Sequence, residues 1–268
     1  MSFSVLMSLY TKERPNNLLQ SLESVFNQTL KPSEVILMED GPLNIELYSV
    51  LKDLGKVHPE LRRIKLSKNR GLGNALNEGL KHCSYELVAR MDTDDIAKPD
   101  RFEKQINFME RNPDISVCSS NIDEFIDSTD NIISTKKIPE KHREILRYAK
   151  KRCPINHPAV IYKKKDVINC GGYGPFPEDY YLWAKMLKEG YQFYNIQEPL
   201  LWFRTSNDVY KRRGGFKYFR SMAKLQTYMY KIHFITLPQY LYNLSIRSIV
   251  SLIPNSLRKQ IYNHLLRQ

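Results

Sequence analysis

Arg90-Met91-Asp92-Thr93-Asp94-Asp95 is the stretch that decides how this chain folds. Residues 85–89, which precede it, are rich in β-formers and contain no Gly or Pro, so they predict a short buried strand. Residues 96–101, which follow it, predict the restart of a helix, with Pro99 and Asp100 as entry residues. The stretch therefore joins a buried strand to a helix and places three carboxylates at the end of that strand.

Three carboxylates this close together repel one another, and a bound cation would relieve the repulsion. Carboxylate oxygens suit Mg²⁺ or Mn²⁺, so the spacing indicates a metal site. The alternative is a polar loop in which one Asp caps the following helix, which explains one of the three residues well. The spacing alone is compatible with both interpretations.

Strand and helix patterns alternate over about the first 110 residues. Strands are predicted at 3–10, 34–38 and 63–66, and helices at 15–26, 44–56 and 74–81. Such alternation is typical of a parallel α/β sheet, in which ligands lie at the carboxyl ends of the strands. Residues that fall at those ends are Tyr10, Asp40, Arg70 and Asp92. We therefore expect a ligand site along this edge of the sheet.

The pattern changes from Ile115 onward. Short strands are predicted at 115–119, 132–136 and 159–162, and helices near 140–150 and 179–188. We see no internal repeat and no low-complexity linker.

Charge is distributed unevenly along the 268 residues, whose 42% hydrophobic and 26% charged content is ordinary for a globular protein. The net charge is +12, and no Asp or Glu follows Asp208. Residues 1–208 hold 30 basic and 29 acidic side chains. The 11 basic residues that follow are Lys211, Arg212, Arg213, Lys217, Arg220, Lys224, Lys231, Arg247, Arg258, Lys259 and Arg267. The sequence thus predicts a balanced domain, residues 1–208, and a basic tail, residues 209–268.

The tail mixes its basic residues with aromatic ones and predicts an amphipathic helix. The apolar residues that share one helical face are Tyr242, Ile246, Ile249, Val250 and Ile253. Pro238 and Arg247 interrupt the apolar run, so we do not expect a membrane-spanning helix. A basic amphipathic segment suits an anionic membrane surface, which we favour. The alternatives are a helical cap with a solvated basic face and, least favoured, a nucleic-acid contact, and we expect no nucleic-acid partner.

The compartment predicted from the sequence is the cytoplasm. Phe3 to Leu9 is too short for a signal peptide and runs into charged residues. The four cysteines, Cys83, Cys118, Cys153 and Cys170, form no CxxC pair and indicate neither a zinc site nor a disulfide framework.

A series of motifs in the chain resembles family 2 glycosyltransferases of the GT-A fold. The matching motifs, in order, are Ser8-Leu9-Tyr10, Phe26-Asn27-Gln28-Thr29, Glu39-Asp40-Gly41-Pro42, Asn69-Arg70-Gly71, Asp92-Thr93-Asp94-Asp95 and Glu178-Asp179-Tyr180-Tyr181-Leu182-Trp183. The resemblance implies an α/β, Rossmann-like fold with a mainly parallel central sheet flanked by helices. It further implies a nucleotide-binding half at about 1–112 and an acceptor half at about 113–208, followed by the basic helical extension.

The resemblance also implies which residues meet the nucleotide-sugar donor. Ser8, Tyr10 and Asp40 would surround uracil, Arg70 would face the nucleotide and Asp92 the ribose. A divalent cation, Mn²⁺ or Mg²⁺, would be held by Asp94, aided by Asp92 or Asp95, and Asp95 would also lie near donor or acceptor. From the residues alone, Tyr10 could equally be a core aromatic and Asp40 a turn-forming residue.

For the acceptor side, the resemblance makes Asp179 the base, with Glu178 beside it. The alternative is that both carboxylates only complement a helix N-terminus. Trp183 could stack on a sugar or lie in the core, and His157 could line the donor-sugar pocket or make a structural hydrogen bond. Arg204 is expected at the diphosphate.

Two departures from the family pattern refine this expectation. The QxxRW motif of processive synthases is absent at residues 197–201, which favours addition of a single sugar. No His follows Arg204, so the third protein ligand of the cation is left open. Residues 212–215 are a candidate lid over the donor.

Residues 4–43 are similar to bacterial enzymes that extend undecaprenyl-diphosphate-linked sugars for O-antigen, capsule or exopolysaccharide. The resemblance therefore implies an inverting, metal-dependent, non-processive transferase of glucose or galactose from a UDP-sugar, peripheral on the inner face of the cell membrane. The rival interpretations are a sugar-phosphate nucleotidyltransferase and a non-catalytic membrane-associated assembly factor with the same fold.

Overall fold

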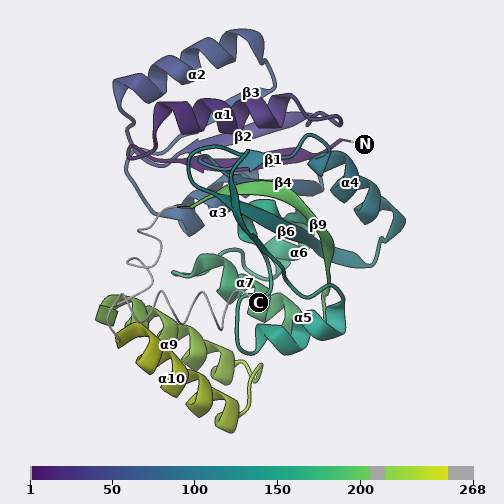
Figure 1. Cartoon of the computed structure of the whole chain (residues 1–268), viewed down its shortest axis with the longest axis vertical. Helices are drawn as coiled ribbons and strands as arrows, with labels where there is room; N and C mark the ends of the chain where they lie inside the picture. The colour runs from purple at the N-terminus through teal and green to yellow at the C-terminus, as the bar shows by residue number, and fades with distance from the viewer. Residues whose placement is uncertain (1, 206–214, 253–268) are drawn as a thin grey trace.

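The first half of the chain forms the parallel sheet that the alternating pattern predicts. The computed structural model describes residues 2–205 and 215–252 (Figure 1). The parallel strands lie in the order β3, β2, β1, β4, with bounds β1 Ser4–Leu9, β2 Glu34–Glu39, β3 Leu61–Lys65 and β4 Leu87–Asp92. The connecting helices are α1 Pro15–Phe26, α2 Ile45–Val57 and α3 Leu72–His82. Strand β4 runs through Asp92, three residues beyond the predicted strand.

The second half extends this sheet with mixed pairing. Its elements are β5 Ile96–Ala97, α4 Arg101–Arg111, β6 Ile115–Phe125, β7 Ile132–Lys136, α5 His142–Ala149, the 3₁₀ turn η1 His157–Ala159, β8 Ile161–Lys163, α6 Lys164–Asn169, α7 Glu178–Lys188 and β9 Gln192–Arg204. Strand β8 pairs antiparallel with both β4 and β6, and thereby joins the two halves. Strand β9 runs parallel to β6, whereas β7 runs antiparallel to it. The described residues thus form one nine-stranded α/β sheet with a parallel first half.

The predicted helix start at residues 96–101 is wrong for its first two residues. Ile96 and Ala97 form strand β5, which pairs antiparallel with Trp202 and Leu201 of β9. Helix α4 begins only at Arg101, after the predicted entry residues. Because β9 lies about a hundred residues further along the chain, a local pattern does not reveal this pairing.

Helices cover both faces of the sheet, which explains the continuous apolar runs of its central strands. Along β1, Val5 and Met7 pack in one buried cluster with α1, α2 and α4. The intervening Leu6 packs in a second cluster with α3, α5 and α7. This alternation follows from the two-residue period of a strand.

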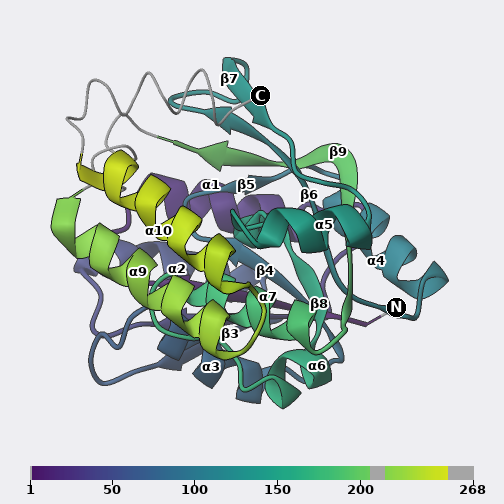
Figure 2. The ribbon, with the colours of Figure 1, turned by 90° about the horizontal axis from the view of Figure 1, so that it is seen from below.

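The described part of the tail forms two helices, α9 Gly215–Lys231 and α10 Leu237–Leu252, which lie side by side against α7 and α5 (Figures 1 and 2). Met222, Leu225 and Met229 of α9 are buried in the same cluster as α7, so the tail shares the core of the sheet domain. The predicted boundary at 208/209, residues 212–214 of the candidate lid at 212–215, and Ile253 lie outside the described residues. The remaining lid residue, Gly215, begins α9.

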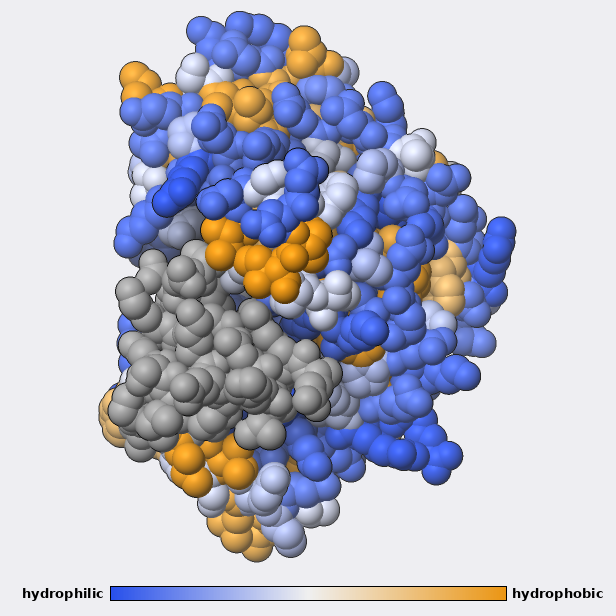
Figure 3. Space-filling model, viewed as in Figure 1, coloured by the Kyte–Doolittle hydropathy of each residue, from blue (hydrophilic) through white to orange (hydrophobic). Residues whose placement is uncertain are grey.

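Helix α10 leaves an apolar face uncovered. Leu241, Tyr242, Ile246 and Ile249 are each between 44% and 59% exposed. Hydrophobic surface is visible at the end of the molecule formed by α9 and α10 (Figure 3). Within the described ranges, no helix combines the length and apolarity needed to cross a bilayer.

Candidate active site

The acidic loop after β4 gathers its three carboxylates at one point. Oxygen atoms of Asp92, Asp94 and Asp95 all lie within 4.8 Å of one another. Ser21 of α1 donates a hydrogen bond to the carbonyl oxygen of Asp92 (3.0 Å), and Arg90 donates from Nη2 to the Asp92 carboxylate. The loop is therefore fixed from the helix on one side and from its own strand on the other.

Arg204, the last residue of β9, is hydrogen-bonded to the same loop. Its backbone N–H donates to Asp95 Oδ1 (2.8 Å), and its Nε donates to the carbonyl oxygen of Asp94 (2.9 Å). Nη2 donates to Gln20 of α1 (2.6 Å), and the guanidinium lies 4.6 Å from the ring centre of Phe125. In this structure Arg204 holds the acidic loop, and its predicted contact with the diphosphate stays a prediction.

Burial and mutual repulsion make the acidic loop a fitting cation site. Burial, with the negative charges of Asp92 and Glu13, raises the pKa of Asp94 to about 7. Burial and the two neighbouring carboxylates also raise the pKa of Asp95 well above its usual value. Asp95 Oδ2 has no hydrogen-bond partner among the described residues. An unpartnered buried oxygen beside two further carboxylates is a donor set that suits Mn²⁺ or Mg²⁺.

Asp95 itself has 0% exposed surface. Its carboxylate is therefore closed to direct contact with donor or acceptor in this arrangement, and its predicted place near them stays a prediction. Its carboxylate instead ties the loop to Arg204.

The predicted nucleotide residues lie along the carboxyl edge of the parallel strands. Ser8 pairs in register with Asp92, and Tyr10, which follows β1, is 43% exposed and so is not a core aromatic. The carboxylate of Asp40, after β2, accepts the backbone N–H of Arg70 (2.6 Å) and of Gly71 (3.0 Å). Asp40 thus ties the end of β2 to the loop that carries exposed Arg70. Contact of these residues with uracil stays a prediction.

Gly41 permits the close approach of these two loops. Its φ is +89°, and a Cβ there would lie 2.6 Å from the backbone nitrogen of Asn69. Neither the conformation nor the space admits a larger residue at low cost.

Glu178 and Asp179 open helix α7 on the other side of β4. Burial raises the pKa of both carboxyl groups. Cys153 Sγ donates to Asp179 Oδ2 (3.4 Å), and this bond, with the charge of Arg90, opposes the rise for Asp179. A Cβ at Gly73 of α3 would lie 2.8 Å from the Glu178 side chain, so the starts of α3 and α7 are in close contact.

Arg90, which is not among the predicted site residues, donates to Asp92, and its charge also acts on the Glu178–Asp179 pair. Its side chain is 1% exposed on β4, and it acts electrostatically on Asp94 and Asp95 as well as on Glu178 and Asp179. Its Nε and Nη1 have no hydrogen-bond partner within the described ranges. A charged residue in an otherwise apolar strand was the signal for it, because a buried arginine needs compensating carboxylates.

His157 and Trp183 belong to one aromatic cluster around Tyr173. His157 Nε2 is 3.2 Å from the hydroxyl of Tyr173, which in turn donates to Tyr162 (3.2 Å). Burial and the charge of Arg90 lower the pKa of His157 well below its usual value, so the ring is neutral near pH 7. Trp183 is 0% exposed and packs edge-on against Tyr173 and Phe193. Its predicted stacking on a sugar is therefore wrong, and it is a core residue.

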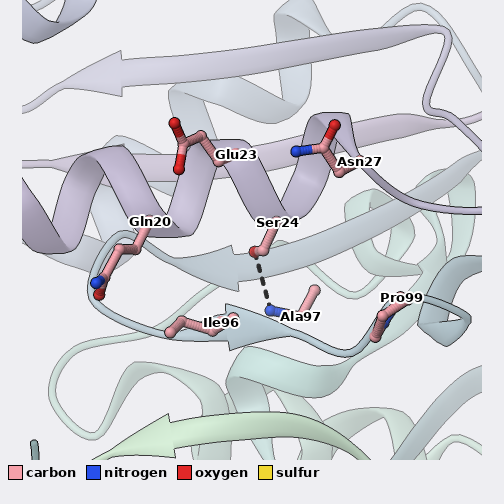
Figure 4. Close-up of a pocket in the computed structure, with 7 residues that line it drawn as sticks. All are labelled: Gln20, Glu23, Ser24, Asn27, Ile96, Ala97 and Pro99. Atoms are coloured by element: carbon pink, nitrogen blue, oxygen red, sulfur yellow. Dashed lines mark hydrogen bonds between the residues drawn. The ribbon is translucent and has the colours of Figure 1, made fainter. Parts of the chain in front are cut away.

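A separate pocket of about 310 Å³ lies between α1 and β5 (Figure 4). Gln20 and Ser24 of α1 point toward β5, where Ser24 Oγ accepts the backbone N–H of Ala97 (3.0 Å). None of the predicted site residues lines this pocket, so it is not the candidate active site.

Comparison with known proteins identifies the family. Residues 4–172 match the family model described as "Glycosyl transferase family 2". The chain belongs to this family. The predicted resemblance and the predicted GT-A fold are thus confirmed.

Two relatives of this glycosyltransferase are close over most of their length. One, from Escherichia coli, is 41% identical over 268 residues, covering 99% of this chain and 97% of the relative, and is named "UDP-Gal:alpha-D-GlcNAc-diphosphoundecaprenol beta-1,3-galactosyltransferase". The other, from Erwinia amylovora, is 40% identical over 225 residues, covering 83% of this chain and 84% of the relative, and is named "Amylovoran biosynthesis glycosyltransferase AmsE".

A solved structure shares the fold of this glycosyltransferase. It is that of S. aureus TarS residues 1–349 in complex with UDP-GlcNAc, with a TM-score of 0.69 and 14% identity. The match covers 99% of this chain and 76% of that one.

Proposed function

We propose that this glycosyltransferase moves one hexose, galactose or glucose, from a UDP-sugar to a saccharide linked to undecaprenyl diphosphate, with inversion at the anomeric carbon. The observation that carries the proposal is the cluster of Asp92, Asp94 and Asp95 beside Arg90, whose buried charge also acts on the carboxylates of Glu178 and Asp179. The name and nearly full-length identity of the E. coli relative support the donor and the acceptor class.

Asp179 acts as the base in this proposal. The acceptor hydroxyl oxygen attacks the anomeric carbon of the donor while its proton passes to the Asp179 carboxylate, and UDP leaves with the electron pair of the broken bond. A single displacement of this kind inverts the anomeric configuration. Glu178 lies beside the base, and burial together with the charge of Asp179 raises its pKa.

The donor lies, in this proposal, along the carboxyl edge of β1, β2 and β4. Ser8, Tyr10, Asp40 and Arg70 contact the nucleotide, Asp92 contacts the ribose, and His157 lies beneath the donor sugar. Asp94 and Asp92 hold Mn²⁺ or Mg²⁺, supported by the clustered oxygens and the unpartnered Asp95 Oδ2. Such a cation stabilises the negative charge that develops on the diphosphate leaving group.

A transfer assay tests this function. The acceptor is GlcNAc linked through diphosphate to a short, water-soluble alkyl chain, and UDP-galactose, UDP-glucose and UDP-GlcNAc are compared with Mn²⁺ and with EDTA. We expect one added hexose per acceptor, formed only with the metal. A sugar nucleotide made from UTP and a sugar phosphate would instead indicate a nucleotidyltransferase, and no reaction would indicate an assembly factor.

Arg204 gives a sharper test of the acidic loop. Arg204→Ala should weaken both Mn²⁺ binding and donor binding by about tenfold or more, because hydrogen bonds from a charged group are worth about 1.5–3 kcal/mol each. Arg204→Lys should restore little, since lysine lacks the planar fork that reaches Gln20 and the Asp94 carbonyl together. Isothermal titration with Mn²⁺ and then with UDP measures both affinities.

Gln20→Ala serves as the matched control for this experiment. It removes one of the Arg204 contacts and leaves those to Asp94 and Asp95, so its effect should be smaller. Equal Mn²⁺ affinity in Arg204→Ala and the unaltered protein would show that Arg204 does not hold the acidic loop in its metal-binding arrangement.

Membrane attachment on the cytoplasmic face is also part of the proposal. It is supported by the exposed apolar face of α10 and by a tail that carries basic but no acidic residues. Replacing Leu241 and Ile246 by serine should lower the affinity for anionic liposomes by about tenfold or more, because each buried aliphatic side chain contributes roughly 1.5–3 kcal/mol. Liposome co-sedimentation measures this.

The matched control replaces Ile45 and Val57, which are 79% and 67% exposed on α2, by serine. Liposome binding of this control should equal that of the unaltered protein. If both pairs lower binding alike, the apolar face of α10 is not the contact.

A further inference from the structure

Three side-chain donors from α7 and α10 hold the end of helix α5. The bonds are Tyr180 Oη to the Ala149 carbonyl (2.7 Å), Asn243 Nδ2 to the Lys150 carbonyl (2.7 Å) and Arg247 Nη2 to the Lys151 carbonyl (2.8 Å). The last carbonyl groups of a helix lack partners within the helix, so side-chain donors can fix them. Arg247 adds a positive charge where the helix dipole is negative. The chain is thus held at three consecutive residues as it leaves α5.

Two residues further on, this segment reaches the predicted base. Cys153 Sγ lies 3.4 Å from Asp179 Oδ2 and 3.6 Å from the carbonyl oxygen of Ile155. A thiol has one proton to donate, and an ionised carboxylate is a stronger acceptor than a carbonyl group. Cys153 therefore helps to fix the Asp179 carboxylate through this hydrogen bond. Any shift of residues 150–153 would displace the thiol that donates it.

Asn243 is itself fixed on the tail side. It is 5% exposed, and its second N–H donates to Gln226 Oε1 of α9 (2.8 Å), a residue with 0% exposure. Both hydrogens of the Asn243 amide are therefore used, one within the tail and one toward α5. A continuous set of hydrogen bonds therefore connects α9 through α10 to residues 150–153, of which Cys153 contacts Asp179.

We propose that Asn243 and Arg247 are positioning residues for catalysis, which hold residues 150–153 and through Cys153 the carboxylate of Asp179. The inference rests on the proposed function, in which Asp179 is the base. It makes α10 part of the catalytic unit, so the tail contributes to turnover of an acceptor that never meets a membrane. Contact of the α10 apolar face with lipid is a separate property, because Asn243 and Arg247 point toward α5.

Variants of Asn243 and Arg247 test the inference with the soluble acceptor. Asn243→Ala and Arg247→Met should each lower kcat by between about tenfold and a hundredfold, the range that small displacements of a catalytic group produce. The KM for the UDP-sugar should stay within about twofold, because neither residue lies near the nucleotide edge. Arg247→Lys should recover most of the activity, since an ammonium group can still donate to the Lys151 carbonyl.

The matched control is Arg111→Met, which removes an exposed positive charge from α4 and should leave kcat unchanged. A kcat of the two variants equal to that of the unaltered protein overturns the inference. So does an equal loss in Arg247→Lys, because the donor would then not be what matters.

Alkylation of Cys153 gives a readout that needs no transfer activity. Iodoacetamide labelling followed by mass spectrometry should be slow in the unaltered protein, and about fivefold faster in Asn243→Ala, the factor that one ordinary hydrogen bond gives. Cys83, Cys118 and Cys170 are buried and report general unfolding in the same spectra. Equal acceleration at all four cysteines would mean general loosening and would overturn the inference.

The two readouts separate the inference from the proposed function. An unaltered protein that transfers no sugar rejects the proposed function, whereas selective labelling of Cys153 in the variants still shows that α10 holds the segment. An active unaltered protein with active, slowly labelled variants rejects the inference alone.

Discussion

Asp179→Asn should lower kcat by between about 10² and 10⁴-fold and leave the KM for the UDP-sugar almost unchanged, because the amide cannot take the acceptor proton. Shape and burial are preserved, and Cys153 can still donate to the amide oxygen that replaces Oδ2. The remaining kcat of the variant should also no longer fall at low pH. Burial raises the pKa of Asp179, so kcat of the unaltered protein should fall as the pH drops through that raised value. Steady-state kinetics across pH measure both effects.

Glu178→Gln is the matched control, since it changes the adjacent carboxylate of the same helix turn. Removal of its charge should have a smaller effect on kcat than Asp179→Asn. The opposite order would assign the base to Glu178. A large rise in donor KM for Asp179→Asn would place that residue in the donor site instead.

Local patterns were sufficient to predict the parallel half of the sheet. Apolar alternation and helix entry residues are local properties, so the predicted strands at 34–38 and 63–66 lie within β2 and close to β3. The position of the site at the carboxyl ends of the strands could be predicted from topology, because parallel strands bring Tyr10, Asp40 and Asp92 to one side of the sheet. Motif resemblance added Asp179, which no periodicity in the chain would have selected.

Pairing between distant segments could not be predicted in this way. Strand β9 contains Pro199 and charged Glu198 and pairs with irregular register, so its strand pattern is weak. Its last residue nevertheless holds the acidic loop, across 109 residues of sequence, through the Asp95 carboxylate. The same limit applies to α10, whose Asn243 reaches α5 across 93 residues.

Arg90 and Trp183 show that the burial of a side chain can change the role inferred for it from a sequence motif. The acidic motif predicts a cluster of three carboxylates, whereas the charge of Arg90, buried two positions before Asp92, acts on Asp179 as well. Trp183 lies one helical turn beyond Asp179, but this turn of α7 runs into the core beside Tyr173 and Phe193. Position along a helix predicts the face and not the depth of a side chain.

Asp94→Ala should abolish metal-dependent transfer, with a loss of about 10³-fold or more, because a cation at the leaving group is worth several kcal/mol of stabilisation. Mn²⁺ affinity should fall with it, as measured by isothermal titration. Without metal the variant should resist unfolding at least as well as the unaltered protein at pH 8. The pKa of Asp94 is raised from 3.8 to about 7, so its ionised form destabilises the fold, and metal-free protein should lose stability as the pH rises through that range.

Asp127→Ala removes an exposed carboxylate from the β6–β7 turn and is the matched control, with Mn²⁺ affinity and transfer expected to equal those of the unaltered protein. Added Mn²⁺ should raise the unfolding temperature of the unaltered protein and of this control, and should leave Asp94→Ala unchanged. Tight Mn²⁺ binding that survives in Asp94→Ala would show that the cation does not depend on this carboxylate. In that case Asp92 and Asp95, whose Oδ2 atom has no hydrogen-bond partner among the described residues, would be the next residues to replace.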